Sequence, residues 1–169
     1  MTRRRALAGS IGFLFVGPLL EAGIGPYVVT GGFERGDGAL DHVVFTVVGL
    51  VLVVLGALVV AACIARFIAD GIGTPSPLAP PQRLVARGPY RFVRNPMYVA
   101  TAALITGEGL LIARPILLIA AALYVVALAI VVRRSEEPLL ARRFGASWED
   151  YRRNVPGWIP RLTPWRADA

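Results

Sequence analysis

Two adjacent acids, Glu136 and Glu137, stand next to Pro138 just beyond an apolar stretch. One interpretation is an exposed helix end, because Arg133 precedes the acids by three and four residues, the spacing of helical salt bridges. Pro138 argues against this, because its ring clashes with the carbonyl four residues earlier and kinks a helix. Two carboxylates at a kink indicate a ligand site, where they would accept the hydroxyls of a sugar or balance a cation.

A second polar segment precedes another apolar stretch. It consists of Arg94, Asn95, Pro96, Met97 and Tyr98. Asn95 is a favoured N-cap and Pro96 a favoured first helical residue, so the segment predicts a helix start. The backbone N–H groups of such a start, flanked by Arg91 and Arg94, also predict an anion site. The residues alone support both interpretations about equally.

The chain lacks the residues of several common catalytic centres. All 18 basic residues are Arg, which excludes a phosphate-binding loop with Lys. His42 is the single histidine, and a predicted helix separates it from the polar segments by on the order of 35 Å. Cys63 is the single cysteine, so no internal disulfide is possible. We therefore expect neither a metal site nor a Ser-His-Asp centre.

The composition is that of an integral membrane protein. Of the 169 residues, 56% are hydrophobic and 17% charged, with a mean hydropathy of +0.61, whereas soluble domains are near one quarter charged. A helix needs about 20 residues to cross a bilayer. Four apolar stretches reach or approach that length, at residues 6–29, 43–65, 97–113 and 116–132. They lack the alternating polar residues of barrel strands, so we predict one all-α domain over residues 1–169, an integral membrane bundle of about four transmembrane helices.

The arginines predict the orientation of this bundle. Only Arg35 and Arg114 lie in the connections on one side, and the other sixteen lie toward the opposite side. By the positive-inside rule, both termini and the segments 70–96 and 133–161 face the cytoplasm, as in a bacterial-type inner or plasma membrane. Such arginines contact anionic lipids, so we expect no nucleic-acid partner despite the net charge of +7. A cleaved signal peptide is the alternative for residues 1–25.

Other residues bear on how the predicted helices pack. Arg114 and Pro115 alone separate the last two spans and predict a tight helical hairpin. Glu21 and Glu108 are acids inside spans, where a charge is costly unless paired, and for Glu108 an interhelical contact is favoured. The segment after residue 132 continues the fourth helix as a cytoplasmic C-terminal helix. Its aromatic residues are predicted to be interfacial anchors; they are Trp148, Tyr151, Trp158 and Trp165.

Several short motifs follow one another in an order that resembles a known family. They are Gly88 to Arg91, Arg94 to Tyr98, Glu136 to Pro138, Phe144 and Gly145, Tyr151, and Val155 and Pro156. In this order they resemble the integral-membrane S-adenosyl-L-methionine-dependent methyltransferases that include isoprenylcysteine carboxyl methyltransferases and phospholipid N-methyltransferases. The resemblance covers residues from about 71 to 161. It implies that S-adenosyl-L-methionine binds at the cytoplasmic ends of the helices.

The resemblance also implies roles for individual residues. The cofactor-binding residues would be Gly71, Gly73, Arg94, Asn95, Pro96, Tyr98, Glu136, Glu137, Leu140 and Tyr151. Catalysis or acceptor positioning would involve Glu137, Arg91 and Arg161. Asn95 stands where the isoprenylcysteine branch usually has His, whereas the segment from Phe144 to Arg161 is closer to that branch. The signature is therefore split, and the acceptor is either a carboxylate or an amine.

We therefore predict methyl transfer from S-adenosyl-L-methionine to a lipid or other amphipathic acceptor. A carboxylate acceptor needs no base, whereas an amine, or especially a hydroxyl, needs one, for which the candidates are Glu136, Glu137 and Tyr98. The alternative is a non-enzymatic membrane protein, such as a small transporter subunit or scaffold, in which Glu21 and Glu108 would form an intramembrane polar pathway. A third possibility keeps the fold but assigns another reaction, such as a reduction.

Overall fold

The computed structural model describes residues 17–71 and 83–166, and all regular elements in these ranges are helices. In chain order they are η1 (Leu20–Ile24), α2 (Gly25–Val29), α3 (Val43–Arg66), η2 (Phe67–Gly71), η3 (Gly88–Arg91), α4 (Pro96–Leu111), α5 (Pro115–Val131), η4 (Val132–Glu136), α6 (Glu137–Phe144) and α7 (Ala146–Asn154). Here η3 is a 3₁₀ turn, and the other η elements are π-helical turns. The predicted all-α fold is confirmed.

Two helices are long and apolar enough to cross a membrane, judged by length and composition. One runs through α3 and η2 as Val43–Ala69, and the other runs from α5 through α6 as Pro115–Phe144. The 16 residues of α4 extend about 24 Å, less than the roughly 30 Å of a bilayer core. Residues 6–16 of the first predicted span lie outside the described residues. The count of four spans therefore stays a prediction.

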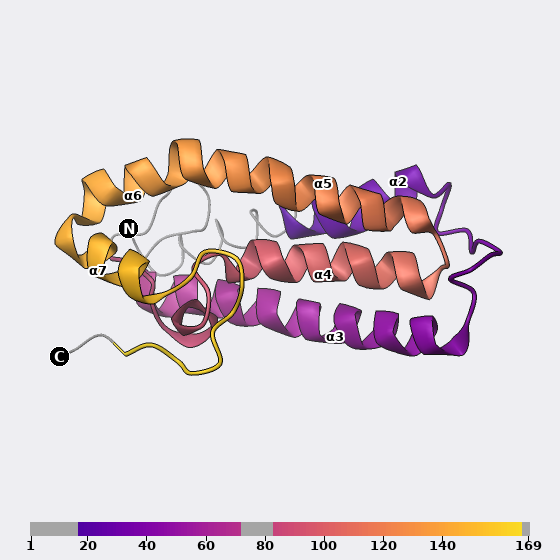
Figure 1. The fold of residues 1–169 in the computed structure, drawn as a ribbon, viewed down its shortest axis with the longest axis horizontal. Helices are drawn as coiled ribbons and strands as arrows, with labels where there is room; N and C mark the ends of the chain where they lie inside the picture. Colours follow the sequence, from indigo (N-terminus) through magenta and orange to yellow (C-terminus); the bar gives the residue numbers. More distant parts are fainter. Residues whose placement is uncertain (1–16, 72–82, 167–169) are drawn as a thin grey trace.

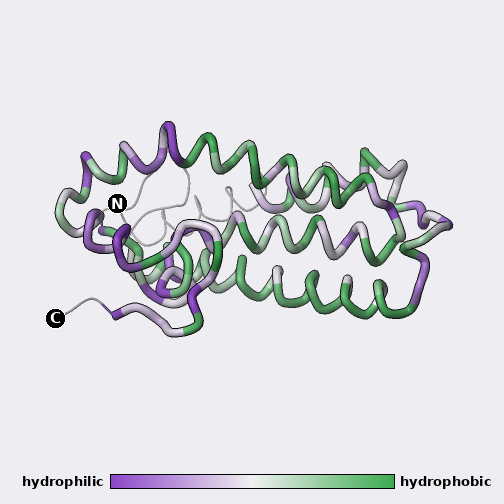
Figure 2. The backbone as a smooth tube through the Cα atoms, in the orientation of Figure 1, coloured by the Kyte–Doolittle hydropathy of each residue, from purple (hydrophilic) through white to green (hydrophobic). Residues whose placement is uncertain are grey.

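The long helices turn large apolar side chains outward. Val43 and Leu58 on α3 and Leu123 on α5 are each more than three-fifths exposed. Apolar surface of this extent is unusual on a soluble monomer and is the expected lining of a helix in lipid. Figure 2 shows the same pattern, with hydrophobic residues along the helices and hydrophilic residues gathered toward the two ends.

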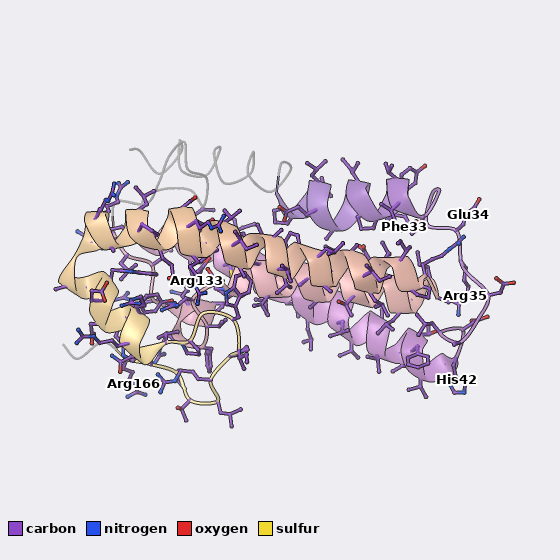
Figure 3. All side chains as sticks on the ribbon, turned by 45° about the horizontal axis from the view of Figure 1, so that its top comes forward. Phe33, Glu34, Arg35, His42, Arg133 and Arg166 are labelled. Atoms are coloured by element: carbon purple, nitrogen blue, oxygen red, sulfur yellow. The ribbon has the colours of Figure 1, made fainter. Side chains whose placement is uncertain are left out.

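The helices α3, α4 and α5 lie side by side with α4 in the middle, and α2 lies beside α5 (Figure 1). We call the end at which α4 begins and η4 lies the site end. We call the opposite end, with residues 30–42 and 112–114, the loop end. His42 precedes α3 at the loop end and its ring accepts a hydrogen bond from the Val44 amide at 3.3 Å. Figure 3 shows His42 at the far end from Arg166, so this histidine is remote from the site end.

Small residues allow α3 and α4 to approach closely. A Cβ added at Gly49 would lie 2.7 Å from the Gly107 carbonyl oxygen, and one at Gly107 would lie 2.7 Å from the Gly49 carbonyl oxygen. Two turns along α3, a Cβ at Gly56 would meet the Ala100 carbonyl oxygen at 2.9 Å. Glycines at such contacts are typical of helix pairs in membranes, where packing replaces the hydrophobic effect as the driving force.

The hairpin predicted at Arg114 and Pro115 is confirmed. α4 ends at Leu111 and α5 begins at Pro115, and the Arg114 amide donates to the Gly109 carbonyl at 2.8 Å. A Cβ added at Gly109 would lie 2.9 Å from Leu117 Cβ, so the glycine allows α4 and α5 to approach closely. The two helices are therefore antiparallel neighbours. Because of this, the end of α5 returns to the level at which α4 begins.

Candidate functional site

The helix that leaves α5 widens directly before Pro138. In η4 the Glu137 amide donates to the Val132 carbonyl, five residues earlier. Pro138 then falls in the first turn of α6, where its missing N–H group requires no partner. The distortion predicted from Pro138 is present, in the form of a π-helical turn rather than a break. It places Glu136 at the end of η4 and Glu137 at the start of α6.

Glu137 forms an ion pair with Arg94, which lies just before α4. The Arg94 Nη2 to Glu137 Oε1 distance is 2.8 Å, and the two side chains are 13% and 23% exposed. Arg94 also donates to the Arg152 carbonyl at 3.0 Å and lies over the Trp148 ring, 5.5 Å from its centre. Its Nε is buried and has no hydrogen-bond partner among the described residues. The Glu137 carboxylate therefore faces Arg94 at the start of α4. It does not pair with Arg133 of its own helix, which is exposed.

Glu136 binds the other polar side chain of that helix start. The Tyr98 hydroxyl donates to Glu136 Oε1 at 2.6 Å. The Tyr98 ring is stacked with Trp158, with centres 6.4 Å apart and planes 19° apart. Two carboxylates, a guanidinium and two aromatic rings thus meet where the start of α4 faces the η4–α6 junction. This cluster is the candidate site.

Asn95 lies at the predicted N-cap position of α4, but it does not cap the helix with its side chain. Its side chain makes no capping hydrogen bond, and its amide nitrogen donates to the Gly157 carbonyl at 3.0 Å. The Asn95 backbone N–H donates to the same carbonyl at 3.2 Å. The predicted N-cap position is confirmed, but the Asn95 side chain binds the distant Gly157 carbonyl instead of the first-turn amides of α4. The prediction that Pro96 begins the helix is confirmed.

The segment after α7, residues 155–166, which we call the tail, runs along residues 91–95. The Arg94 amide donates to Pro156, the Arg161 amide to Phe92, and the Trp165 amide to Arg91, at 2.8, 2.9 and 2.9 Å. These backbone bonds hold the segment that leads into α4. The tail supplies the Trp158 ring and the Gly157 carbonyl to the site.

The guanidinium groups of Arg91 and Arg161 bind the tail and its junction with α7. Arg91 Nε donates to the Trp165 carbonyl at 2.6 Å. Arg161 Nη1 donates to the Asn154 carbonyl at 2.7 Å. The described contacts do not join either side chain to Glu136 or Glu137. Arg91 and Arg161 therefore lie beside the cluster of Arg94, Tyr98 and the two acids, and their predicted roles stay proposals.

A buried, largely aromatic cluster on α7 and at the start of the tail, which we call the supporting core, packs beside the site. Trp148, Tyr151 and Val155 are at most 3% exposed, and Leu140 packs against them. The Tyr151 hydroxyl donates to the Tyr90 carbonyl at 2.7 Å. Burial raises the pKa of Tyr151 well above its ordinary value, so the phenol stays a neutral donor. The prediction that Trp148 and Tyr151 are interfacial anchors was wrong, because these side chains lie inside the protein.

Four predicted site residues lie in the supporting core, at the limit of the described residues or outside them. Gly71 is the last residue of η2, directly before the undescribed segment, and Gly73 lies outside the described residues. Leu140 and Tyr151 belong to the supporting core. Trp158 is predicted first as an interfacial anchor and is not among the predicted site residues. The signal in the sequence that could have indicated its position is the presence of three prolines in the tail. Prolines disfavour a helix, so this segment was free to lie in an extended form against another part of the protein.

The two acids inside the predicted spans, Glu21 and Glu108, differ in their hydrogen-bond partners. Tyr124 of α5 donates a hydrogen bond to Glu21 at 2.8 Å, so Glu21 joins the N-terminal segment to the bundle. Glu108 Oε2 is buried and has no hydrogen-bond partner within residues 17–71 and 83–166. Over the same described residues, no group of three or more His, Cys, Asp or Glu side chains could hold a metal ion.

Comparison with known proteins gives one family. The sequence profile of the family described as Phospholipid methyltransferase matches residues 44–147, from the start of α3 to the start of α7. A relative is the nickel-cobalt-cadmium resistance protein NccN of Alcaligenes xylosoxydans xylosoxydans, 36% identical over 86 residues. That match covers 51% of this chain but only 40% of the relative's length. No solved structure matches the chain. Because the family match covers more than half of the sequence, this chain belongs to the phospholipid methyltransferase family.

Proposed function

We propose that the protein transfers a methyl group from S-adenosyl-L-methionine to a lipid or other amphipathic acceptor at the cytoplasmic face of a membrane. Membership of the phospholipid methyltransferase family supports the reaction class and the lipid-type acceptor. The observation that carries the proposal is the meeting of Glu136 and Glu137 with Tyr98 and Arg94 at one end of apolar helices. An acceptor anchored in the membrane by its apolar part would present its polar group at this level.

The side chains of the site fit the polar groups of the proposed cofactor. Carboxylates are suitable acceptors for the two ribose hydroxyls, which are the role proposed for Glu136 and Glu137. The partly satisfied guanidinium of Arg94, with the helix start from Asn95 to Tyr98, suits the amino-acid carboxylate. The rings of Tyr98 and Trp158 are flat apolar surfaces beside these groups. Supporting positions at Gly71, Gly73, Pro96, Leu140 and Tyr151 complete the proposed cofactor site.

The work of the protein in this reaction is alignment. The cofactor supplies a methyl group on a positively charged sulfur, and displacement at that carbon requires the acceptor atom in line with the bond that breaks. The chain would hold both reactants and exclude water, which together account for most of the rate. If the acceptor is an amine, Glu136 or Glu137 would take its proton. Tyr98 would take it only while passing its own hydroxyl proton to Glu136, to which it donates a hydrogen bond. A carboxylate acceptor requires no base.

Arg91 and Arg161 are proposed to position an anionic acceptor head group. Arg91 donates one observed hydrogen bond to a backbone carbonyl. Arg161 donates one to a backbone carbonyl and a longer one to the Thr163 hydroxyl, whereas a guanidinium has five N–H donors. Both lie on segments joined to the start of α4, close to the proposed level of the head groups. The excess of arginine at the site end supports a cytoplasmic orientation for this end and for both termini.

Calorimetric titration with S-adenosylhomocysteine, in detergent and in nanodiscs, tests the proposal. We expect saturable binding to one site in the unaltered protein and loss of binding in Glu137→Ala. Glu136→Gln keeps the shape of its side chain and should weaken binding at least tenfold, about 1.4 kcal/mol. Glu149→Gln removes an exposed acid paired with Arg152 and should bind normally.

A thermal unfolding curve for each variant separates binding from folding. Glu137→Ala leaves Arg94 without its ionic partner and is expected to lose some stability, so Glu136→Gln carries the decision if Glu137→Ala unfolds. Absence of binding by the folded, unaltered protein in nanodiscs would contradict the methyltransferase proposal and favour a non-enzymatic membrane protein.

A further inference from the structure

The tail carries the two most exposed large apolar side chains that the structure describes. Leu162 is 97% exposed and Ile159 is 79% exposed, whereas the lipid-facing residues of α3 do not exceed 69%. Both lie outside the helices that could cross a membrane. Exposed apolar side chains of this size, close together in one segment, mark an interaction surface.

The tail is held so that these two side chains face away from the protein. Trp158 stacks on Tyr98, and the Trp165 ring centre lies 5.4 Å from that of Tyr151. The backbone of Arg161 is tied to Phe92 by a hydrogen bond. The tail thus directs Trp158 and Trp165 toward the protein. Ile159 and Leu162 point away from it, on a backbone that these contacts hold in place.

The tail lies at the level where the lipid-facing surface ends. Figures 1 and 3 show it beside the site end of the bundle, next to the ends of α3 and α4. Its backbone pairs with residues 91–95, directly before α4 begins. A bilayer around the exposed apolar side chains of α3 would therefore reach its head-group layer near the tail.

The chemistry of the tail suits that layer. Residues 155–166 contain no acid, and Arg161 and Arg166 add positive charge beside the two apolar side chains. Prolines at 156, 160 and 164 reduce the number of N–H groups that would be costly to remove from water. An apolar surface flanked by arginine is the pattern of segments that lie in a membrane interface.

We propose that the tail is a membrane-interface anchor, with Ile159 and Leu162 inserted among lipid chains and Arg161 and Arg166 beside anionic lipid head groups. The anchor would fix the depth at which Trp158 and the start of α4 stand relative to the lipid surface. This inference concerns the lipid contact of the tail and does not depend on the methyltransferase proposal.

Spin-label accessibility in nanodiscs tests the anchor. Nitroxides are attached to Ile159→Cys and Leu162→Cys, and to Arg153→Cys on α7 as an exposed control. Cys63 is fully buried, and the unaltered protein gives the labelling blank. In discs of equimolar phosphatidylcholine and phosphatidylglycerol, we expect both tail labels to favour collisions with oxygen, which partitions into lipid. The label at 153 should favour a water-soluble nickel chelate.

Two results would overturn the proposal. One is nickel accessibility at 159 and 162 equal to that at 153, which would place both side chains in water. The other is protection from both reagents, which would show a protein surface over the tail. Arg166→Gln tests the contribution of charge. Adding phosphatidylglycerol to the discs should move the nitroxide at Leu162→Cys deeper into the lipid, and Arg166→Gln should make this movement smaller. An unchanged movement would remove Arg166 from the anchor.

Discussion

Arg94 illustrates how one side chain joins separate segments at the site. Its guanidinium contacts Glu137 at the start of α6, the Arg152 carbonyl of α7 and the face of Trp148. A lysine could not reproduce this set, because an ammonium lacks the planar fork that makes several directed hydrogen bonds and stacks on a ring. The position therefore requires arginine for geometry as well as for charge.

Tyr151 offers a test of the supporting core at the scale of one atom. Tyr151→Phe removes the hydroxyl that donates to the Tyr90 carbonyl and leaves a buried acceptor unpaired. We expect a loss of about 1–3 kcal/mol in the free energy of unfolding, measured by denaturant titration in detergent. Tyr27→Phe, at a half-exposed ring, is the matched control and should be nearly neutral. Equal stability of the two variants would contradict the role assigned to this hydrogen bond.

The same substitution should alter the dependence of stability on pH. Burial raises the pKa of Tyr151 in the folded protein, so the folded state binds the phenol proton more tightly than the unfolded state. Its contribution is complete below the unfolded pKa of about 10 and declines as the pH rises further. The gap in stability between the unaltered protein and Tyr151→Phe should therefore narrow above about pH 10. A gap that stays constant to higher pH would argue against a buried, neutral phenol.

Among the elements, α3 and α4 depend on close backbone contact. Gly49→Ala places a methyl group 2.7 Å from the Gly107 carbonyl oxygen, and no flexible side chain can move to make room. We expect a loss of about 1–3 kcal/mol, typical of overpacking, measured by unfolding in detergent. Gly23→Ala, where the nearest contact is an ordinary 3.4 Å from a leucine side chain, should have no such cost. An unaffected Gly49→Ala protein would show that the two helices stand further apart.

The π-helical turn η4 shows how an element can depend on one residue. A regular helix would bring the Pro138 ring against the Arg134 carbonyl, and widening by one residue avoids the clash while the chain remains helical. The widening also turns Glu136 and Glu137 toward the start of α4. There Glu136 accepts a hydrogen bond from Tyr98, and Glu137 accepts one from Arg94. A proline that usually interrupts a helix here sets the direction of two functional side chains.

For the molecule as a whole, the tail joins residues far apart in sequence into one site. A chain ending at Asn154 would lose the Trp158 ring, the Gly157 carbonyl and the backbone bonds to residues 91–95. We expect it to retain most of its helical circular dichroism, because α3, α4 and α5 pack without the tail. Its affinity for S-adenosylhomocysteine should fall at least tenfold. A chain ending at Arg166 keeps every described tail contact and is the control; equal affinities would show that the tail does not support the site.

Much of the architecture was predictable because it depends on local sequence. Apolar stretches of helical length specify helices in a membrane environment, and the short break at Arg114 and Pro115 favours a tight hairpin between the last two of them. Pro96 begins α4 and Pro138 distorts its helix, since proline lacks an N–H group whatever its surroundings. The family resemblance rested on short motifs in a fixed order, and the family match confirms it.

The partners of the polar side chains were decided only by the tertiary structure. Helical spacing made Arg133 the natural partner of the acids, yet Glu137 pairs with Arg94, 43 residues away. Asn95 likewise had a local capping role available and instead binds Gly157, 62 residues away. The physical reason is common to both cases. Spacing along one helix says which groups can meet, but the pair that forms is the one that packing brings together and shields from water.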